Sequence, residues 1–269
     1  MTEFSDDVRT MVDAARAAGA GLRARQAQLG ELTVRHKSGP ADLVSIADEE
    51  AEQAVHAVLS AARPDYGFLG EEGGARGAGE RQWIVDPLDG TTNFLFGGPL
   101  WGVNVALAER GRVIAGVTFL PVLDELYVAE AGRGAWLGGR RLRVSARATL
   151  GECVLSCGIP FHGKPDHDVF AREMALLSSR TSGLRRTGAC SVDMAFVAAG
   201  RWDAYWERAL NAWDMAPGVI LVQEAGGTAT GVDGGPLVLD GGHVLVSNGA
   251  VHAALLGELE RARRGEALA

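Results

Sequence analysis

The chain has 269 residues, 47% of them hydrophobic and 22% charged, and its 26 Lys and Arg residues against 34 Asp and Glu residues give a formal net charge of −8. This composition is typical of a folded protein with a sizeable core and excludes disordered and collagen-like chains. The acidic balance argues against nucleic-acid binding by phosphate neutralisation. We also expect no secretory signal and no membrane-spanning helix, because the first residues are acidic and no apolar run approaches about 20 residues.

The cysteines and histidines are scattered along the chain. The three cysteines, Cys153, Cys157 and Cys190, form neither an even disulfide framework nor a C-x-x-C pair. The six histidines show no zinc-type spacing. Together these observations predict a reducing, cytoplasmic setting.

The first part of the chain is predicted to form helices and then short strands. A stretch rich in Ala and Arg predicts a helix over residues 4–28. Asp48 has the character of an N-cap for a helix over Glu49–Ala62, in which apolar residues recur at helical spacing. Phe68–Leu69 and Trp83–Val85 are predicted to be strands, and each is followed by acidic residues.

The next part predicts an antiparallel meander of β-rich runs that are separated by turns. Its strands are expected at Val103–Leu107, Val113–Leu120, Glu125–Ala129 and Ala135–Leu137. Beside the meander lies a basic group, which lacks interleaved aromatic residues and is interpreted as a solvated edge and not as a nucleic-acid surface. Its members are Arg133, Arg140, Arg141, Arg143 and Arg147.

The second half of the chain mixes both kinds of element. Helices are predicted over about 166–179, 189–199 and 214–225 and from about Gly249, and strands over Val154–Cys157 and Val244–Ser247. Helices and antiparallel strands in layers indicate an α+β sandwich. Since no flexible linker is visible, we expect one domain over residues 1–269, with subdomains of about 1–150 and 151–269.

The segment Trp83–Phe94 carries the clearest chemical signal. A buried strand is predicted to lead into Asp86, Pro87 to end its pairing, and Asp89 with Gly90 to turn the chain. The amides of Gly90–Thr92 would then open a helix and form a cradle for phosphate. Because carboxylates beside such a cradle repel phosphate unless cations intervene, this arrangement predicts hard divalent metals with oxygen ligands, most plausibly Mg²⁺.

This segment resembles the signature of the inositol monophosphatase family, in which an apolar strand leads into D-P-(I/L)-D-G-T-T-N-F. Lys37–Asp48 matches the family's K-S-x-P-x-D-L-V-T-x-x-D stretch, and Gly70–Glu72 matches G-E-E. Trp213–Gly218 and Gln223–Gly227 match W-D-x-A-x-G with E-A-G-G. The resemblance covers about residues 5–260. It implies a layered αβαβα sandwich and a Mg²⁺-dependent phosphomonoesterase that acts on inositol monophosphate or a similar polyol or sugar phosphate.

The resemblance also implies a set of metal ligands. A first Mg²⁺ would be held by Glu71, Asp86 and the Leu88 carbonyl, and a second by Asp86, Asp89 and Asp214, with Asp86 bridging the two. Such a pair of metals neutralises the phosphate and stabilises the attacking and leaving oxygens of an in-line displacement. Many members of the family use a third, weaker Mg²⁺ at Glu71 and are inhibited by lithium, and we expect the same here.

Catalytic roles follow from the same resemblance. Thr91, paired with Asp48, would take the proton of the attacking water, which Glu71 helps to position. Asp48 and Asp214 have a simpler interpretation as helix caps, with Pro217 tolerated in the first turn of its helix. The glutamates after Asp48 are expected to form a solvated helix start: Glu49, Glu50 and Glu52. Two motif residues remain. Lys37 is expected either near the site or in a solvated position, and Asp42 is expected to brace a loop.

The substrate side departs from the family pattern. Arg186–Ser191 resembles the R-x-x-G-x-A-A segment that lines the substrate ring, and Glu207 matches a carboxylate that accepts hydrogen bonds from ring hydroxyls. The implied substrate-binding set is Gly90, Thr91, Gly188, Cys190 and Glu207. Cys190 stands where the family usually has alanine, and Ala209 where it commonly has glycine, which leaves the preference for inositol open. We interpret Cys190 as a packing residue and not as a nucleophile.

Other functions remain open within and beyond the family. Its relatives also act on fructose 1,6-bisphosphate, histidinol phosphate and 3′-phosphoadenosine 5′-phosphate, and Thr92–Asn93 argues against the last, whose enzymes usually have Lys-Glu there. A non-catalytic metal- or partner-binding relative would have lost at least one ligand, and every expected ligand is present. Because the family commonly dimerises, a homodimer is expected.

Overall fold

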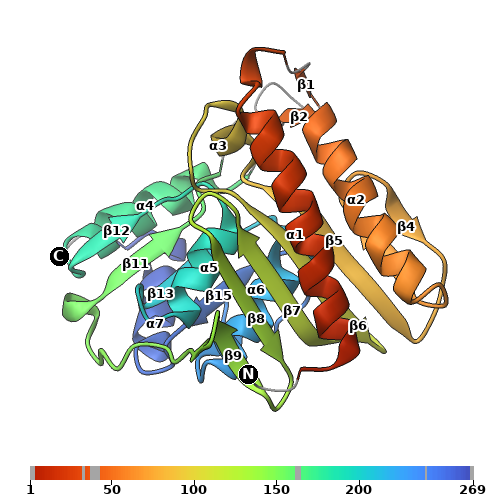
Figure 1. The fold of residues 1–269 in the computed structure, drawn as a ribbon. Coiled ribbons are helices and arrows are strands. Elements are labelled where there is room, and N and C mark those ends of the chain that lie inside the picture. Colours follow the sequence, from red (N-terminus) through yellow and green to blue (C-terminus); the bar gives the residue numbers. More distant parts are fainter. Residues whose placement is uncertain (1–3, 32–33, 37–42, 161–164, 240, 267–269) are drawn as a thin grey trace.

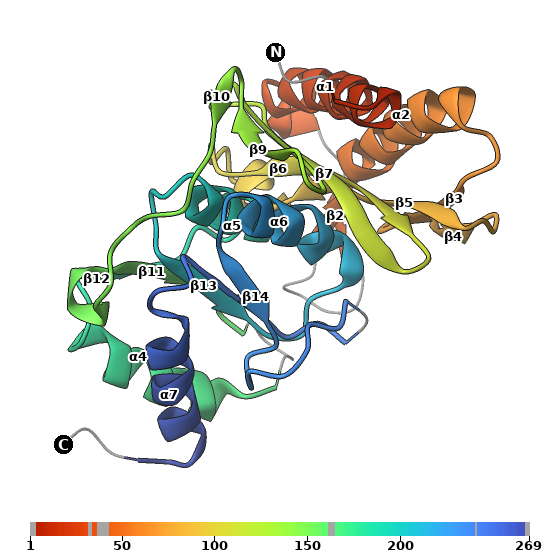
Figure 2. The same cartoon turned by 90° about the horizontal axis from the view of Figure 1, so that it is seen from below.

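The computed structural model describes residues 4–31, 34–36, 43–160, 165–239 and 241–266. Helices and sheets alternate in five layers, beginning and ending with helices (Figures 1 and 2). The α+β layered sandwich and the αβαβα order are therefore confirmed. Among the residues that the structure describes, none of the helices combines the length and the apolar character needed to span a membrane.

The larger sheet has eight strands in the order β10-β9-β8-β7-β6-β5-β3-β4, and neighbours are antiparallel except for the parallel pair β3 and β5. Its strands are β3 (Gly67–Gly70), β4 (Gly74–Arg76), β5 (Arg81–Asp89), β6 (Gly102–Glu109), β7 (Arg112–Leu120), β8 (Glu125–Glu130), β9 (Gly134–Leu137) and β10 (Arg140–Arg141). The predicted meander is β6 to β9. β6 is buried along nearly its whole length because helices cover both faces of the sheet.

Helices α1 (Asp6–Gln26) and α2 (Ile46–Ala62) cover one face of this sheet, and α5 (Cys190–Ala198) and α6 (Ala212–Glu224) cover the other (Figure 2). Successive side chains of β5 point to opposite faces of the sheet. Trp83 and Val85 pack into the core beneath α1 and α2, whereas Ile84 packs with Ala216 of α6.

Helix α6 lies unusually close to the sheet. A Cβ atom on Gly116 of β7 would lie 2.9 Å from Pro217 Cα, so a larger residue at this point would push the helix away. Pro217 lies inside α6 and beyond its first turn, not within the first turn as the sequence suggested. The missing N–H of proline leaves one helix carbonyl without its usual partner there.

The smaller sheet has five strands in the order β12-β11-β13-β15-β14. Its strands are β11 (Val154–Cys157), β12 (Gly183–Arg185), β13 (Ala204–Glu207), β14 (Thr228–Thr230) and β15 (Val244–Ser247). Helices α4 (His167–Ser178) and α7 (His252–Arg263) form the outer layer on its far face (Figure 2). Trp206, Leu177 and Leu255 lie in the core between them.

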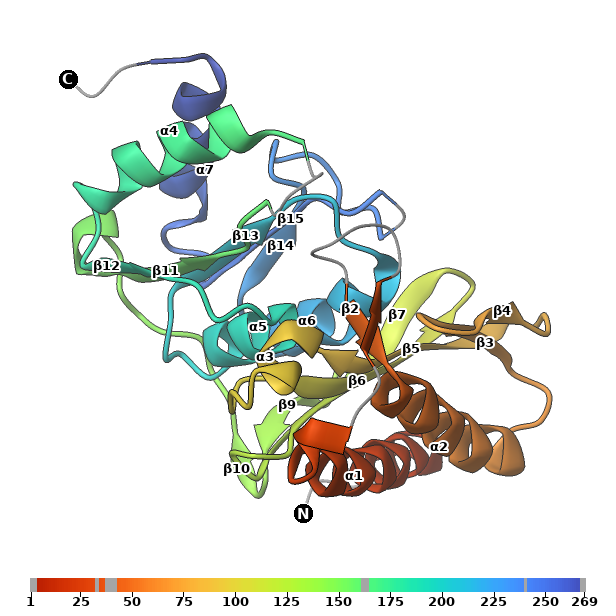
Figure 3. The same ribbon diagram turned by 90° about the horizontal axis from the view of Figure 1, so that it is seen from above.

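Three short elements lie at one end of the molecule. β1 (Val34–His36) and β2 (Leu43–Ser45) form a two-stranded antiparallel sheet, and α3 (Thr91–Leu95) lies at the same end of the molecule (Figures 1 and 3). Single 3₁₀ turns occur at Leu29–Glu31 and Leu150–Glu152.

Candidate functional site

Two neighbouring parallel strands bring Glu71 and Asp86 together. Gly70 at the end of β3 pairs with Val85 of β5, so the residue that follows each of them lies at the same carboxyl edge. The Glu71 amide donates to Val85 O over 3.2 Å, and a hydrogen bond joins the Glu71 and Asp86 carboxyl groups. The charge of Glu71 disfavours ionisation of Asp86 and so raises the pKa of Asp86.

Strand β5 continues past Asp86 and corrects one expectation. Pro87 does not end the pairing: β5 extends to Asp89, with a register shift between Asp86, which pairs with Asn104, and Asp89, which pairs with Gly102. A proline fits at such an irregularity because it has no N–H to donate.

The irregularity in β5 brings the main-chain groups of Leu88 close to Asp86 and Thr91. Asp86 Oδ1 accepts from the Leu88 amide over 3.0 Å, and Thr91 Oγ1 lies 3.1 Å from Leu88 O. Gly90, with φ of +89°, then turns the chain into α3. Carboxylate and carbonyl oxygens thus occur together along one short stretch, and these are the ligand types that Mg²⁺ prefers.

Asp48 and Asp214 occupy equivalent positions in the first turns of α2 and α6. Ser45 and Asn211 are the N-cap residues, and their amides donate to Asp48 Oδ2 over 2.8 Å and to Asp214 Oδ2 over 2.7 Å. Both helices therefore begin with a capping box, and neither aspartate is the N-cap that the sequence suggested. Asp48 Oδ1 remains on the other side of the carboxylate, 3.1 Å from Thr91 Oγ1.

Asp89 lies against the start of α5. Its Oδ2 accepts from the Ser191 amide over 2.6 Å, where the helix dipole favours a negative charge. Burial raises the pKa of Asp89 to about 6, although the Ser191 and Cys190 hydrogen bonds oppose the rise. α5 therefore holds the Asp89 side chain in place without removing the electrostatic cost of its charge.

The remaining carboxyl groups are close enough to disturb one another. Burial raises the pKa of Asp86 well above its usual value, and the charges of Glu71, Asp89 and Asp214 raise it further. Burial and the Glu71 charge do the same for Asp214. Such mutual repulsion is what a bound divalent cation would relieve.

The ligand chemistry fits Mg²⁺ without a preformed cage. Within the described ranges, no three His, Cys, Asp or Glu side chains are arranged at metal-binding geometry. Mg²⁺ usually keeps several waters and uses one or two carboxylates together with substrate phosphate, so a full protein cage is not required.

The predicted substrate side lies next to this cluster. A Cβ atom on Gly90 would lie 2.9 Å from Ala189 Cβ, so the loop before α5 packs directly on the turn after β5. Asn93 joins the two segments because its Nδ2 donates to Leu100 O over 2.6 Å and to Thr187 O over 2.9 Å. Gly188 has φ of +83° within this loop. Sequence reasoning gave Asn93 no role beyond the motif itself.

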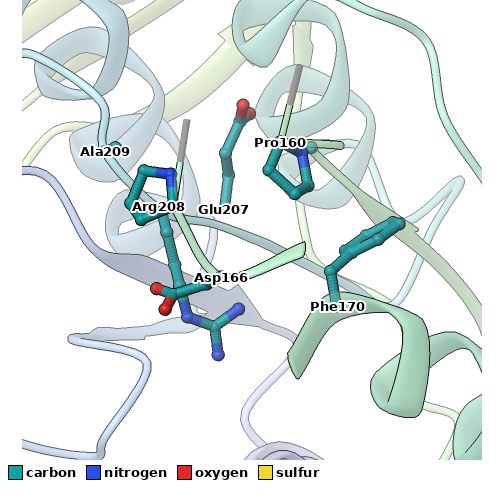
Figure 4. A pocket seen from close by; sticks show the side chains of 8 residues that line it. Pro160, Asp166, Phe170, Glu207, Arg208 and Ala209 are labelled. Carbon is teal, nitrogen blue, oxygen red and sulfur yellow. The ribbon is translucent and has the colours of Figure 1, made fainter. Parts of the chain in front are cut away.

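Cys190 and Glu207 face the cluster from the second half of the chain. The pKa of Cys190 is raised well above its usual value, first by burial and then by the charges of Asp89, Glu207 and Asp214. A buried thiol with a raised pKa is a poor nucleophile, in line with its interpretation as a packing residue. Glu207 also lines a pocket beside the cluster (Figure 4).

Glu52 lies next to the candidate site, and the prediction that it is solvated is wrong. Its exposed fraction is 3%, and its Oε2 accepts from the Glu72 amide over 2.7 Å, so it is not solvated. This contact braces the turn that carries Glu71. Asp48, Glu52 and Val55 follow each other on one buried helix face, and this spacing is the signal that could have revealed it.

Asp193 was also missed. It is buried, and its Oδ2 accepts from Thr187 Oγ1 over 2.6 Å beneath the substrate-side loop. No sequence pattern singled it out. Lys37, expected either near the site or in a solvated position, and Asp42, expected to brace a loop, lie outside the described residues, as does the first half of the Lys37–Asp48 motif.

Comparisons with known proteins show which family the chain belongs to. The sequence model of the inositol monophosphatase family matches residues 5–264. The chain belongs to the inositol monophosphatase family. This family is generally Mg²⁺-dependent, in agreement with the carboxylate cluster.

Relatives within the inositol monophosphatase family span nearly the full chain. An inositol-1-monophosphatase from Mesorhizobium japonicum is 47% identical over 251 residues, which cover 93% of this chain and 94% of that protein. The Nus factor SuhB of Pseudomonas aeruginosa is 43% identical over 249 residues, which cover 90% and 92%. The crystal structure of the extragenic suppressor protein suhB from Bartonella henselae has a TM-score of 0.93 and 42% identity, covering 96% of this chain and 99% of that chain.

Proposed function

We propose that this protein is a Mg²⁺-dependent phosphomonoesterase that hydrolyses inositol monophosphate or a similar polyol phosphate to the alcohol and inorganic phosphate. The observation that carries the proposal is the convergence of four carboxyl groups beside the Asp48–Thr91 pair: Glu71, Asp86, Asp89 and Asp214. The relatives named inositol-1-monophosphatase support it. A homodimer and lithium inhibition are carried over from the family, and a cytoplasmic location from the cysteine pattern, as parts of the same proposal.

The proposed metal ligands divide into two overlapping sets. Glu71, Asp86 and Leu88 O form the first, and Asp86, Asp89 and Asp214 the second. When bound, Mg²⁺ supplies positive charge that offsets the phosphate and favours ionisation of the attacking water. The capping hydrogen bond to Oδ2 of Asp214 fixes its carboxylate, so its other oxygen is oriented before substrate arrives.

Asp48 and Thr91 are proposed to take the proton of the attacking water, with Glu71 helping to position that water. The Thr91 hydroxyl, 3.1 Å from Asp48 Oδ1, accepts this proton while its own passes to the carboxylate. The pKa of Asp48 is raised, chiefly by burial, which makes its carboxylate a better proton acceptor than an exposed aspartate.

The alcohol is proposed to lie between the Gly90 turn, the Gly188–Cys190 loop and Glu207. The amides of Gly90 and Thr91 are proposed to bind phosphate oxygens, since the first amides of a helix lack partners within it. The Glu207 carboxylate accepts hydrogen bonds from hydroxyl groups of the alcohol.

A phosphate-release panel tests this proposal. Inositol 1-phosphate, histidinol phosphate and fructose 1,6-bisphosphate are each incubated with the protein while Mg²⁺ is varied. We expect Mg²⁺-dependent release with the highest kcat/KM for inositol 1-phosphate. A preference for histidinol phosphate or fructose 1,6-bisphosphate would move the protein to the corresponding branch, and no release from any ester would refute hydrolysis.

A binding role is the second candidate, because relatives at 43% and 41% identity are named Nus factor SuhB. A purely non-catalytic relative does not need a complete ligand set. Turnover of any ester in the panel would exclude a purely binding function, whereas Mg²⁺ binding without turnover would favour it.

A further inference from the structure

The pocket beside the carboxylate cluster holds about 330 Å³ of empty space, counting its opening to solvent. It is lined by Gly158, Pro160, Pro165, Asp166, Phe170, Glu207, Arg208 and Ala209. Glu207 and Arg208 are neighbours in the chain, and their side chains leave it in opposite directions (Figure 4). This alternation is expected at the end of a strand, and it places the two charges on different sides of the chain.

On one side, the Glu207 carboxyl group fills a space that only glycine permits. A Cβ atom on Gly158 would lie 1.8 Å from the Glu207 carboxyl carbon. The Tyr205 hydroxyl donates to Glu207 Oε2. Glu207 is therefore packed closely enough that a small shift of its main chain would move the carboxylate.

On the other side, Arg208 is anchored to the outer helical layer. Its Nη2 donates to Glu173 Oε1 over 2.5 Å and its Nη1 to Glu173 Oε2 over 3.1 Å. Glu173 lies on α4 with no exposed surface, and Trp206 Nε1 also donates to it over 2.9 Å. A bidentate pair of this kind fixes direction as well as distance. Because the guanidinium is engaged by Glu173, the chain at Arg208, next to Glu207, is tied to α4.

The chain after this pair adopts a costly conformation. Ala209 has φ of +57°, which alanine adopts only when its surroundings force it. The constraint comes from both ends: Arg208 is held by Glu173, and the Leu210 amide donates to Gly242 O over 2.9 Å. The second contact anchors the chain directly before Asn211, the N-cap of α6.

We propose that the buried Glu173–Arg208 ion pair is a positioning device, by which α4 aims the Glu207 carboxylate at the alcohol and so sets selectivity for hydroxyl-bearing substrates. The proposal rests on the proposed phosphomonoesterase activity. Neither residue is among the groups proposed to act on the phosphate, and of the proposed metal ligands only Asp214 follows this segment in the chain, beyond the Leu210 anchor. Loss of the pair should therefore weaken recognition of the alcohol while leaving phosphate chemistry intact.

The test compares an ester rich in hydroxyl groups with one whose alcohol has none. The double variant E173Q/R208M removes the pair without leaving one buried charge alone, and Gln keeps an acceptor for Trp206. R180M is the matched control, because Arg180 pairs with Glu258 in the same layer away from the pocket. For each protein, kcat and KM are measured with myo-inositol 1-phosphate and with phenyl phosphate.

The expected result is a loss of selectivity that appears in KM. The ratio of kcat/KM for inositol 1-phosphate to that for phenyl phosphate should fall about tenfold in E173Q/R208M, as for a weakened hydrogen bond to a charged group. It should stay unchanged in R180M. An unchanged ratio in a cooperatively melting E173Q/R208M, or equal losses on both esters, would overturn the proposal.

Two further arms keep the proposal falsifiable. If E173Q/R208M does not fold, R208K replaces it. Lysine keeps the charge but not the bidentate geometry, so about a threefold loss of the ratio is expected and no loss overturns the proposal. If the wild-type protein hydrolyses neither ester, the proposed function fails, and a crystal structure of the variant decides this proposal separately: displacement of the Glu207 carboxylate from Gly158 supports it, and an unmoved carboxylate overturns it.

Discussion

At the scale of single residues, the structure differs most from the sequence-based interpretation at aspartates that make two kinds of contact. Asp48 and Asp214 each use carboxylate Oδ2 to cap a helix, and Asp48 Oδ1 accepts from Thr91 Oγ1. A helix cap therefore does not exclude the proposed catalytic and metal-binding roles, because the capping hydrogen bond holds the carboxylate in one orientation. From the sequence, each aspartate had been interpreted either as a helix cap or as a functional residue.

Ala209 gives a prediction at this scale. The left-handed conformation costs alanine about 1–2 kcal/mol, whereas glycine adopts it freely but loses about 0.5–1 kcal/mol through greater freedom when unfolded. The net expectation for Ala209→Gly is about 0.5–1 kcal/mol of added stability and a Tm higher by about 2 °C. Calorimetric melting measures it.

The matched control is Ala148→Gly, at an exposed loop position where φ is not positive. Only the cost in the unfolded state applies there, so Tm should fall. A lower Tm in both variants would contradict the prediction, because it would show that the left-handed conformation of Ala209 does not destabilise the folded protein.

At the scale of elements, the sequence was a good guide to the long elements and to some short strands, and it missed other short strands. The helices and the meander strands follow clear patterns of apolar residues, and they form where predicted. The short strands β4, β10, β12 and β14 pair at sheet edges, where neighbouring backbone and not side-chain pattern decides the conformation. β5 was predicted too short because a proline usually ends pairing, and the register shift that accommodates Pro87 has no local signature.

The candidate site divides in the same way. Asp86 and Asp89 were predicted as ligands from their place at the carboxyl end of a strand, and Glu71 from the resemblance to the family. Contacts between distant segments, such as Asn93 with Thr187 or Glu52 with the Glu72 amide, depend on how layers stack and have no signal in one sequence. Only the face shared by Asp48, Glu52 and Val55 could have indicated that Glu52 is buried.

His252 gives a prediction for the junction of α7 with the smaller sheet. Its ring nitrogens lie 2.8 Å from Ser247 Oγ and 3.0 Å from Thr230 Oγ1, and burial lowers its pKa below the usual 6.5. Because the folded state takes up this proton less readily than the unfolded state, stability should fall as pH drops below about 6.5. In His252→Gln this part of the pH dependence should disappear.

Urea unfolding midpoints between about pH 8 and pH 5 measure the effect of His252. The difference between wild type and variant isolates this side chain from other titrating groups. Parallel curves for the two proteins would contradict the expected coupling of His252 to folding.

At the scale of the whole molecule, the net charge of −8 has a local meaning. Part of the acidic surplus lies on exposed helix surface, but Glu71, Asp86, Asp89 and Asp214 face one another across strands and helices from both halves of the chain. Bringing these charges together opposes folding, and a cation that binds only the folded state would remove the opposition.

Thermal stability should therefore depend on Mg²⁺. At a Mg²⁺ concentration about 100 times Kd, binding adds about 2.7 kcal/mol, so Tm should rise by several degrees above that of the protein in EDTA. NaCl at equal ionic strength is the control for general screening. An equal rise with NaCl would show that the carboxyl cluster has no specific cation site.

The most direct measurement of the central claim is phosphate release by Asp89→Asn. Asparagine is nearly isosteric and keeps an acceptor for the Ser191 amide, so α5 should stay in place, while one proposed ligand charge is lost. We expect kcat/KM for inositol 1-phosphate to fall by about 100-fold or more, with Tm in EDTA unchanged or raised, and the exposed Asp124→Asn to behave as wild type. Turnover by Asp89→Asn equal to that of the wild type would contradict the claim that these carboxylates form the metal-dependent phosphatase site.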